Sequence, residues 1–247
     1  MAHDDTGSSA VLPGSGASGS GGAGSGGSGS PDGSALREAL KAAGVALKQA
    51  EVPFALCGGF AAWVRGAPEP SHDVDFVVPP EHADAARAAL SGAGFDVRQP
   101  PEDWLFKAFR DDAMVDVIMR LSGSDVTADE LARADDLDVL SVRLPVLPAT
   151  ELLVSRLTPL GEHYCDLAPQ LEVSRALREQ VDWAEVAHRT AANPFARAFL
   201  FLLAELGVAD PGEVPGQSER SATTRTDSSA GSAASGTSMP ARTPDVR

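Results

Sequence analysis

The segment from residue 54 to residue 78 constrains the fold of this 247-residue chain more than any other. It begins with a short apolar run, Phe54–Cys57, which is typical of a buried strand, and Gly58 and Gly59 follow directly. A helix of small residues is expected next, over Phe60–Arg65, and a proline-containing turn then leads to a second strand with two acidic residues. The segment therefore predicts a strand–helix–strand unit whose second strand is acidic.

The two acidic residues of the second strand are Asp73 and Asp75, with Val74 between them. Side chains alternate between the faces of a strand, so both carboxylates are expected to point the same way. Like charges this close raise each other's pKa unless a cation lies between them. Hard divalent ions with oxygen ligands, above all Mg²⁺, meet that need. The alternative for an isolated Asp-Val-Asp is a solvated turn.

A third aspartate, Asp116, lies inside the apolar run MVDVIM at 114–119. Carboxylates are rarely buried in a strand unless something pairs with them. Taken alone, Asp116 could be an edge-strand residue that faces water. The combination of a glycine pair after a strand, two aspartates on the next strand and one on a later strand favours a shared metal site instead.

Apolar periodicity and chain-breaking residues predict the remaining elements. Helices are expected over 34–50, 81–93, 151–160, 166–179 and 183–191, and from Pro194 to Gly207; strands are expected over 95–98, 104–110, 113–119 and 141–147. Thr150 is expected to cap the first helix after the sheet, and Asn193 the last one. The predicted fold class is α+β, with a small mixed sheet flanked by helices and followed by a helical C-terminal part.

Composition divides the chain into four parts. Residues 1–33 are mostly Gly and Ser, and residues 211–247 are mostly small and polar, so both are expected to be disordered tails. Between them, the sheet domain is placed at 34–147 and the helical part at 148–210. The N-terminal residues lack the basic leader and apolar core of a signal peptide, and no apolar run approaches membrane-spanning length. Two cysteines are too few for a disulfide framework, so a reducing, cytoplasmic location is expected.

The glycine pair and the aspartates together resemble the nucleotidyltransferase superfamily that includes DNA polymerase β. Its pattern is a hydrophobic residue, two small residues, a linker, then acid–hydrophobic–acid, with a third acid on a later strand. Here the pattern is Cys57-Gly58-Gly59, residues 60–72, Asp73-Val74-Asp75 and Asp116. More narrowly, the chain is similar over about 36–206 to the minimal bacterial nucleotidyltransferases, which include antibiotic-modifying enzymes and toxin-type proteins of toxin–antitoxin systems.

This resemblance implies a nucleotidyltransferase-type sheet and a metal-dependent transfer of a nucleoside monophosphate from an NTP to a hydroxyl, with release of pyrophosphate. The three aspartates would hold two Mg²⁺ ions, and Asp116 would lie near the attacking hydroxyl and help to take its proton. The glycine pair would let the backbone approach the phosphates. Ser71 and Arg65 are further candidates for contacts to the nucleotide.

The chain departs from the family at two places that many minimal members fill with basic residues, because it has His72 and Glu69 there. The triphosphate charge must then be met by other cations. Candidates are Arg65, Lys107, Arg110, Arg120 and Arg156, although each could also be an ordinary surface charge. A nucleotide-binding protein without catalytic activity is therefore an alternative.

The resemblance leaves the acceptor open between a small molecule and tRNA, and it adds an antitoxin as a possible partner. The formal net charge of −15 disfavours broad nucleic-acid binding, because affinity for phosphate backbones comes largely from Lys and Arg. It tilts the choice toward a small or cationic acceptor such as an aminoglycoside. A third alternative is an interaction module in which the acids are merely solvated.

Overall fold

The structure is a computed structural model and describes residues 33–210. The two expected disordered tails lie outside the described residues, apart from residue 33, with which the first helix begins. Within the described part of the chain, no helix is long and apolar enough to cross a membrane. The division of this part at residue 147 stays a prediction.

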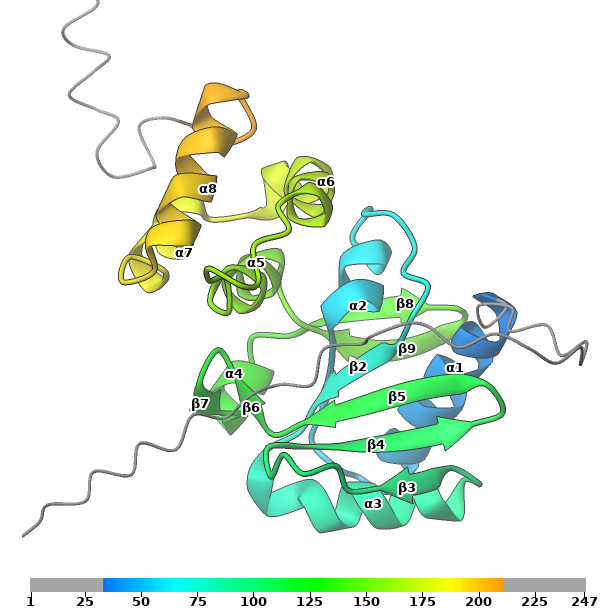
Figure 1. Cartoon of the computed structure of the whole chain (residues 1–247). Coiled ribbons are helices and arrows are strands. Elements are labelled where there is room, and N and C mark those ends of the chain that lie inside the picture. The colour runs from blue at the N-terminus through cyan, green and yellow to red at the C-terminus, as the bar shows by residue number, and fades with distance from the viewer. Residues whose placement is uncertain (1–32, 211–247) are drawn as a thin grey trace, which may run out of the picture.

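A seven-stranded mixed sheet forms the centre of the molecule, in the order β3-β4-β5-β2-β1-β9-β8 (Figure 1). Its strands are β1 (Ala55–Cys57), β2 (Val74–Val77), β3 (Asp96–Arg98), β4 (Leu105–Arg110), β5 (Ala113–Ile118), β8 (Asp135–Val139) and β9 (Val142–Val146). A separate two-stranded sheet contains β6 (Arg120–Leu121) and β7 (Ser124–Asp125). The pairs β2–β5 and β1–β9 are parallel and the other pairs of the large sheet are antiparallel, which confirms the predicted mixed sheet.

Helices cover both faces of the large sheet, and four of them follow it in sequence (Figure 1). They are α1 (Gly33–Gln49), α2 (Gly58–Val64), α3 (Ala83–Gly92), α4 (Ala128–Leu131), α5 (Ala149–Leu157), α6 (Ala168–Leu177), α7 (Trp183–Arg189) and α8 (Pro194–Glu205), with short 3₁₀ turns at Pro80–His82 and Arg178–Gln180. In the view of Figure 1, α1 runs behind the sheet and α3 lies at its lower end beside β3, whereas α2 and the group α5–α8 lie toward the top. The predicted helical C-terminal part is therefore confirmed.

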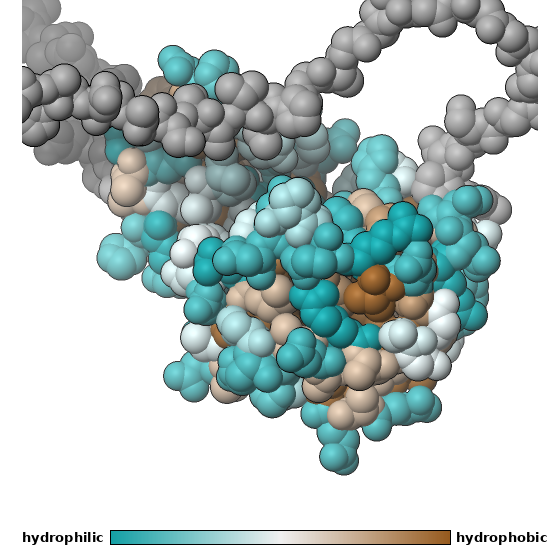
Figure 2. Space-filling view, turned by 60° about the horizontal axis from the view of Figure 1, so that its bottom comes forward, coloured by the Kyte–Doolittle hydropathy of each residue, from teal (hydrophilic) through white to brown (hydrophobic). Residues whose placement is uncertain are grey.

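The two faces of the sheet differ in burial, and β5 shows this most clearly. Its residues Ala113, Val115 and Val117 are fully buried on the side of α1, whereas the alternating Met114, Asp116 and Ile118 are only half-buried. Alternation along a strand places these two sets on opposite faces. The face opposite α1 is thus partly open at β5, and that opening is where the acidic residues lie. Figure 2 shows the molecule from the side of α3, where polar side chains surround small apolar patches.

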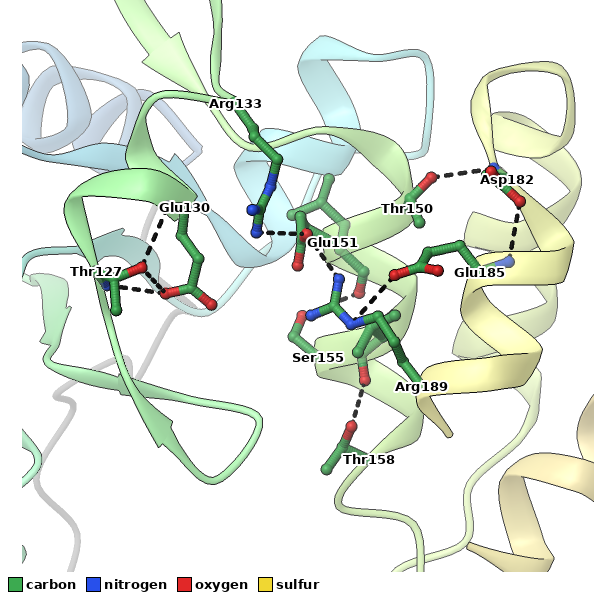
Figure 3. A network of polar contacts seen from close by, with 12 residues as sticks. Thr127, Glu130, Arg133, Thr150, Glu151, Ser155, Thr158, Asp182, Glu185 and Arg189 are labelled. Carbon is green, nitrogen blue, oxygen red and sulfur yellow. Dashed lines mark hydrogen bonds and ion pairs between the residues drawn. The ribbon is translucent and has the colours of Figure 1, made fainter. Parts of the chain in front are cut away.

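Most predicted elements are confirmed within one to three residues, but the N-cap at Thr150 is wrong. Helix α5 begins two residues earlier than predicted, at Ala149, and Pro148 occupies its N-cap. Thr150 lies inside the first turn, where its hydroxyl accepts the N–H of Asp182 at 3.0 Å (Figure 3). Thr150 therefore joins α5 to the start of α7, and Pro148 begins the helix with its fixed φ.

Three short elements, β8, the β6–β7 pair and α4, had no counterpart in the sequence-based prediction. Strand β8 has the sequence DDLDV, and aspartate is depleted in strands, so only its antiparallel pairing with β9 makes it a strand. Helix α4 has a capping box in which Thr127 and Glu130 bind each other's backbone N–H (Figure 3). The spacing Thr-x-x-Glu was a readable signal for this helix.

A buried carboxylate fastens the helical part to the sheet domain. Glu151 on α5 is 7 % exposed and accepts hydrogen bonds from Arg133, which precedes β8, at 3.1 Å and from Arg189 of α7 at 2.7 Å (Figure 3). Burial by itself raises the pKa of Glu151, but Arg189 and Arg133 outweigh it and the pKa is lowered. One ionised side chain therefore links α5, α7 and the segment that leads to β8.

Candidate active site

The glycine pair forms the junction between β1 and α2, and it lies directly against the acidic strand. Gly58 has φ +62°, a conformation that costs an L-residue about 1–2 kcal/mol. A Cβ at this position would lie 1.8 Å from Oδ2 of Asp75. A Cβ on Gly59 would lie 2.7 Å from Cβ of Pro70, in the loop before β2. The sequence needs glycine at both places because the backbone packs against the acidic strand and its loop.

The three predicted aspartates come together at one point of the sheet. Strands β2 and β5 are parallel neighbours, and their register places Asp75 opposite Asp116. Asp73 lies two residues before Asp75 and therefore on the same face. One carboxylate oxygen from each of the three residues lies within 4.8 Å of the others, and all three side chains are half-buried. The predicted convergence of the aspartates is thus present in the fold.

The carboxylates at this point repel one another. Burial, followed by the charges of Asp73 and Asp116, raises the pKa of Asp75 to about 7, although the N–H of Gly59 donates a hydrogen bond to this carboxylate. The pKa of Asp73 is raised as well, first by burial and then by Asp116. Burial and the charge of Asp75 also raise the pKa of the neighbouring Cys57 thiol well above its usual value. The site therefore carries negative charge that its own residues compensate only in part.

One cation, Lys107, is fixed to the third acid. Its Nζ lies 2.8 Å from each oxygen of Asp116 and 3.5 Å from the sulfur of Met114. The antiparallel register of β4 and β5 places Lys107 directly opposite Asp116, so this ion pair is built by the sheet. Sequence reasoning had included Lys107 among five candidate cations, but only the register shows which acid it meets.

A second cation, Arg156, approaches from the helical part. It lies on α5, and its charge acts on Asp75, Asp73 and Cys57. Burial lowers the pKa of this arginine, and Asp75 opposes the effect. Its Nε is buried without a hydrogen-bond partner among the described residues, and its Nη1 has a long 3.5 Å contact with Gln170. A buried guanidinium with unused donors beside a pair of acids is suited to an anionic group.

The structure places Arg65 and Ser71 differently from the aspartates. Arg65 lies at the C-terminal end of α2, where its guanidinium donates to the carbonyls of Leu147 and Val146 and to Asp135 at 2.6 Å. These contacts fasten α2 to β9 and β8. Ser71 is exposed in the loop just before Asp73. A contact of either residue to a nucleotide stays a prediction.

The two positions that depart from the family pattern lie in the same loop. His72 is exposed beside Ser71, whereas Glu69 binds Arg37 of α1, with 2.7 Å between Nε and Oε1. The hydrogen bond from Arg37 lowers the pKa of Glu69. Glu69 therefore fastens the loop before the acidic strand to α1.

Comparison with known proteins agrees with this geometry. A family model described as an uncharacterised nucleotidyltransferase matches residues 34–212. The chain belongs to this nucleotidyltransferase family. The match covers both the sheet and the helical part, so the two parts occur together in the family. No curated protein matches the sequence.

Two solved structures of the antibiotic-resistance factor ANT(2'')-Ia have a similar fold. The solution structure aligns with a TM-score of 0.53 and 14 % identity, over 70 % of this chain and 99 % of that one. The crystal structure of ANT(2'')-Ia with adenylyl-2''-tobramycin aligns with a TM-score of 0.50 and 16 % identity, over 66 % of this chain and 98 % of the other. At this identity the likeness establishes the shared fold, a nucleotidyltransferase fold as the sequence pattern implied.

Proposed function

We propose that this nucleotidyltransferase transfers a nucleoside monophosphate from an NTP to a hydroxyl acceptor in a reaction that depends on a divalent metal ion. The observation that supports the proposal is the meeting of Asp73, Asp75 and Asp116 beside the glycine pair. Phosphoryl transfer needs positioning and compensation of charge rather than a protein nucleophile, and this arrangement offers both. ANT(2'')-Ia, which shares the fold, was solved in complex with adenylyl-2''-tobramycin.

The three carboxylates suit a divalent ion. They supply only oxygen ligands, which hard cations such as Mg²⁺ prefer. Burial first, and then the charges of Asp73 and Asp116, raise the pKa of Asp75, and a bound cation would offset all three effects. Asp73 and Asp75 would share the ions, and Asp116 would complete the set. When bound, Mg²⁺ compensates the charge of the triphosphate and lowers the pKa of the acceptor hydroxyl.

The other residues of the site have distinct proposed roles. Gly58 and Gly59 leave the backbone open for the phosphates, and the buried guanidinium of Arg156 stabilises negative charge on them. In this proposal the carboxylate of Asp116, once released from Lys107, accepts the proton of the attacking hydroxyl. The products are a nucleoside monophosphate ester of the acceptor and pyrophosphate.

Release of pyrophosphate from each of the four NTPs, with and without Mg²⁺, tests this function in the presence of candidate acceptors. Asp73→Asn and Asp75→Asn are expected to reduce the Mg²⁺-dependent rate at least about a hundredfold, because each removes a carboxylate that compensates metal charge. Asp112→Asn, in the exposed turn between β4 and β5, is the matched control and should leave the rate unchanged. Normal turnover in either active-site variant would exclude the proposed role of the acids.

Binding of nucleotide without catalysis is the second candidate, because Glu69 and His72 replace the basic residues of many relatives and Glu69 is held by Arg37. In that case Mg²⁺ and an NTP would stabilise the protein, but no acceptor would release pyrophosphate. An antitoxin-type partner belongs to this second candidate. A tRNA acceptor belongs to the first, and adding tRNA to the pyrophosphate assay tests it. A cytoplasmic location stays a prediction.

A further inference from the structure

A hollow of about 370 Å³ opens between the end of β5 and α5. Its walls are largely apolar and include Trp104, Ile118, Leu121 and Pro159. Trp104 is 37 % exposed and is one of the large apolar residues that the described part of the chain leaves partly open to solvent. A concave apolar surface of this volume with a partly exposed aromatic ring is typical of a small-molecule site.

The hollow adjoins the aspartates. Ile118 follows Asp116 by two residues on β5 and lies on the same half-buried face, about 7 Å further along the strand at the usual rise per residue. On the opposite wall, Ser155 of α5 immediately precedes Arg156, whose charge acts on Asp75. Ile118 therefore places one wall of the hollow on the same face of β5 as Asp116, two residues further along the strand.

The hollow lies on the opposite side of the acids from the glycine pair. The antiparallel pairing of β1 and β2 places Cys57 opposite Asp75, so Gly58 continues toward the start of β2. The parallel pairing of β2 and β5 places Ile118 opposite Val77, at the end of β2. In an in-line displacement the attacking and leaving oxygens lie on opposite sides of the transferred phosphorus. If the leaving pyrophosphate lies at the glycine pair, the attacking hydroxyl comes from the side of the hollow.

The chemistry of the walls indicates what this side accepts. The one charged residue that lines the hollow is Arg120, which has an ion pair with Asp125 at 3.2 Å, and no lining residue is acidic. A polycationic acceptor would find no carboxylate in these walls, whereas an apolar ring would bury its surface against Trp104 and Leu121. The lining itself therefore contributes one positive charge and no negative charge, and Asp125 pairs with that positive charge.

We infer that this hollow holds the hydroxyl acceptor, and that the acceptor carries an uncharged aromatic or alicyclic ring. That the ligand is the acceptor of the transferred group rests on the proposed function. That it carries an uncharged ring rests only on the residues that line the hollow. The inference reverses the expectation of a cationic acceptor that the net charge suggested. The hollow would then bind the ring of the acceptor, and Asp116 beside it would activate the hydroxyl.

Titration of the full chain with phenyl β-D-glucopyranoside, followed by ligand-observed NMR, tests the inference because this probe joins an uncharged aromatic ring to several hydroxyls. Trp104→Ala and Leu121→Ala should each weaken its binding about tenfold, and Trp104→Phe should restore most of the affinity. Leu206→Ala removes an exposed leucine at the end of α8 and is the matched control, which should bind like the wild type. A variant with Asp73→Asn and Asp75→Asn should also bind the glucoside normally.

Three results would overturn the inference: a glucoside affinity that does not depend on Trp104 and Leu121, displacement of the glucoside by adenosine, or tighter binding of tobramycin through the same two residues. Displacement by adenosine would identify the hollow as the nucleobase site. Pyrophosphate release measured on the same preparations reports on the proposed function separately. If the protein binds the glucoside at the hollow but releases no pyrophosphate, the proposed function is contradicted, whereas the ring-binding site is supported.

Discussion

Gly58 combines two constraints that can be separated by experiment. Its φ of +62° is strained for any L-residue, and a Cβ there would also collide with Asp75. Gly207, with φ +64° and no atom within 4 Å of an added Cβ, carries the first constraint without the second. The pair therefore distinguishes backbone strain from the close approach to the acidic strand.

We expect Gly207→Ala to lower the free energy of unfolding by about 1 kcal/mol, the usual magnitude for an L-residue in this conformation. Gly58→Ala should cost about 2–4 kcal/mol, because Asp75 must also move away from the new methyl group. Urea unfolding of both variants measures the two values. Equal destabilisation in the two variants would show that the contact with Asp75 has no energetic weight.

Lys107 supplies a second prediction at the level of the residue. Its ammonium group is bound to both oxygens of Asp116, so a divalent ion that enters the site meets a resident positive charge. Lys107→Met should therefore tighten binding of Mn²⁺ to the nucleotide-free protein about threefold to tenfold. Isothermal titration calorimetry measures the affinity, with Lys41→Met on the exposed side of α1 as the control. Weaker binding in the Lys107 variant would show that this lysine supports the metal site instead.

The ion pairs around Glu151 govern how the helical elements are attached. Glu151→Gln removes a buried charge that two arginines share, and we expect a loss of about 2 kcal/mol in the free energy of unfolding. The value lies below that of a fully buried pair because the Arg133 side chain is half exposed. Glu185→Gln breaks only the exposed contact with Arg189 at 4.0 Å and should change stability by less than about 0.5 kcal/mol. Urea unfolding compares the two variants, and equal effects would contradict the fastening role.

At the level of elements, the sequence was most informative where local chemistry and burial agreed. The hairpin of β4 and β5, the Asn193 cap and the strand–glycine–helix unit are all readable from turn and cap residues close in sequence. Strand β8 was missed because its aspartates favour loops and only its long-range partner β9 makes it a strand. The start of α5 was misplaced because threonine is a common N-cap residue, whereas Pro148 occupies the N-cap without a side-chain hydrogen bond.

For the candidate site, spacing predicted which acids share a face but not which cations meet them. The alternation of Asp73 and Asp75 follows from strand geometry alone, and Asp116 needed only the pairing of β2 with β5. By contrast, the partner of Lys107 depends on the register of β4, and the approach of Arg156 depends on the packing of α5 over the sheet. Neither contact is between residues close in sequence. The sequence alone therefore could not show which of the five candidate cations lie beside the aspartates.

For the whole molecule, the acidic cluster predicts an unusual dependence of stability on pH. The pKa of Asp75 is raised from 3.8 to about 7 in the folded state. Between these two pH values the folded chain keeps a proton that the unfolded chain has released. Stability that this proton provides is present at low pH and is lost as the pH rises from about 4 through about 7.

We therefore expect Asp75→Asn to melt about 5 °C higher than the wild type at pH 8 without metal, and the difference to shrink toward pH 5. Added Mg²⁺ should stabilise the wild type more at pH 8 than at pH 5, because the ion must displace the proton. Thermal melting across this pH range measures both trends. A variant less stable than the wild type at pH 8 would contradict the repulsion among the acids.

The most direct test of the account is thermal melting with each NTP, with and without Mg²⁺, on the wild type and on the variant with Asp73→Asn and Asp75→Asn. Ligand that binds the folded state must raise its melting temperature. The account predicts a rise for the wild type that requires both NTP and Mg²⁺ and is absent in the variant. An equal rise in both proteins, or none in either, would contradict the placement of metal and nucleotide at the paired aspartates.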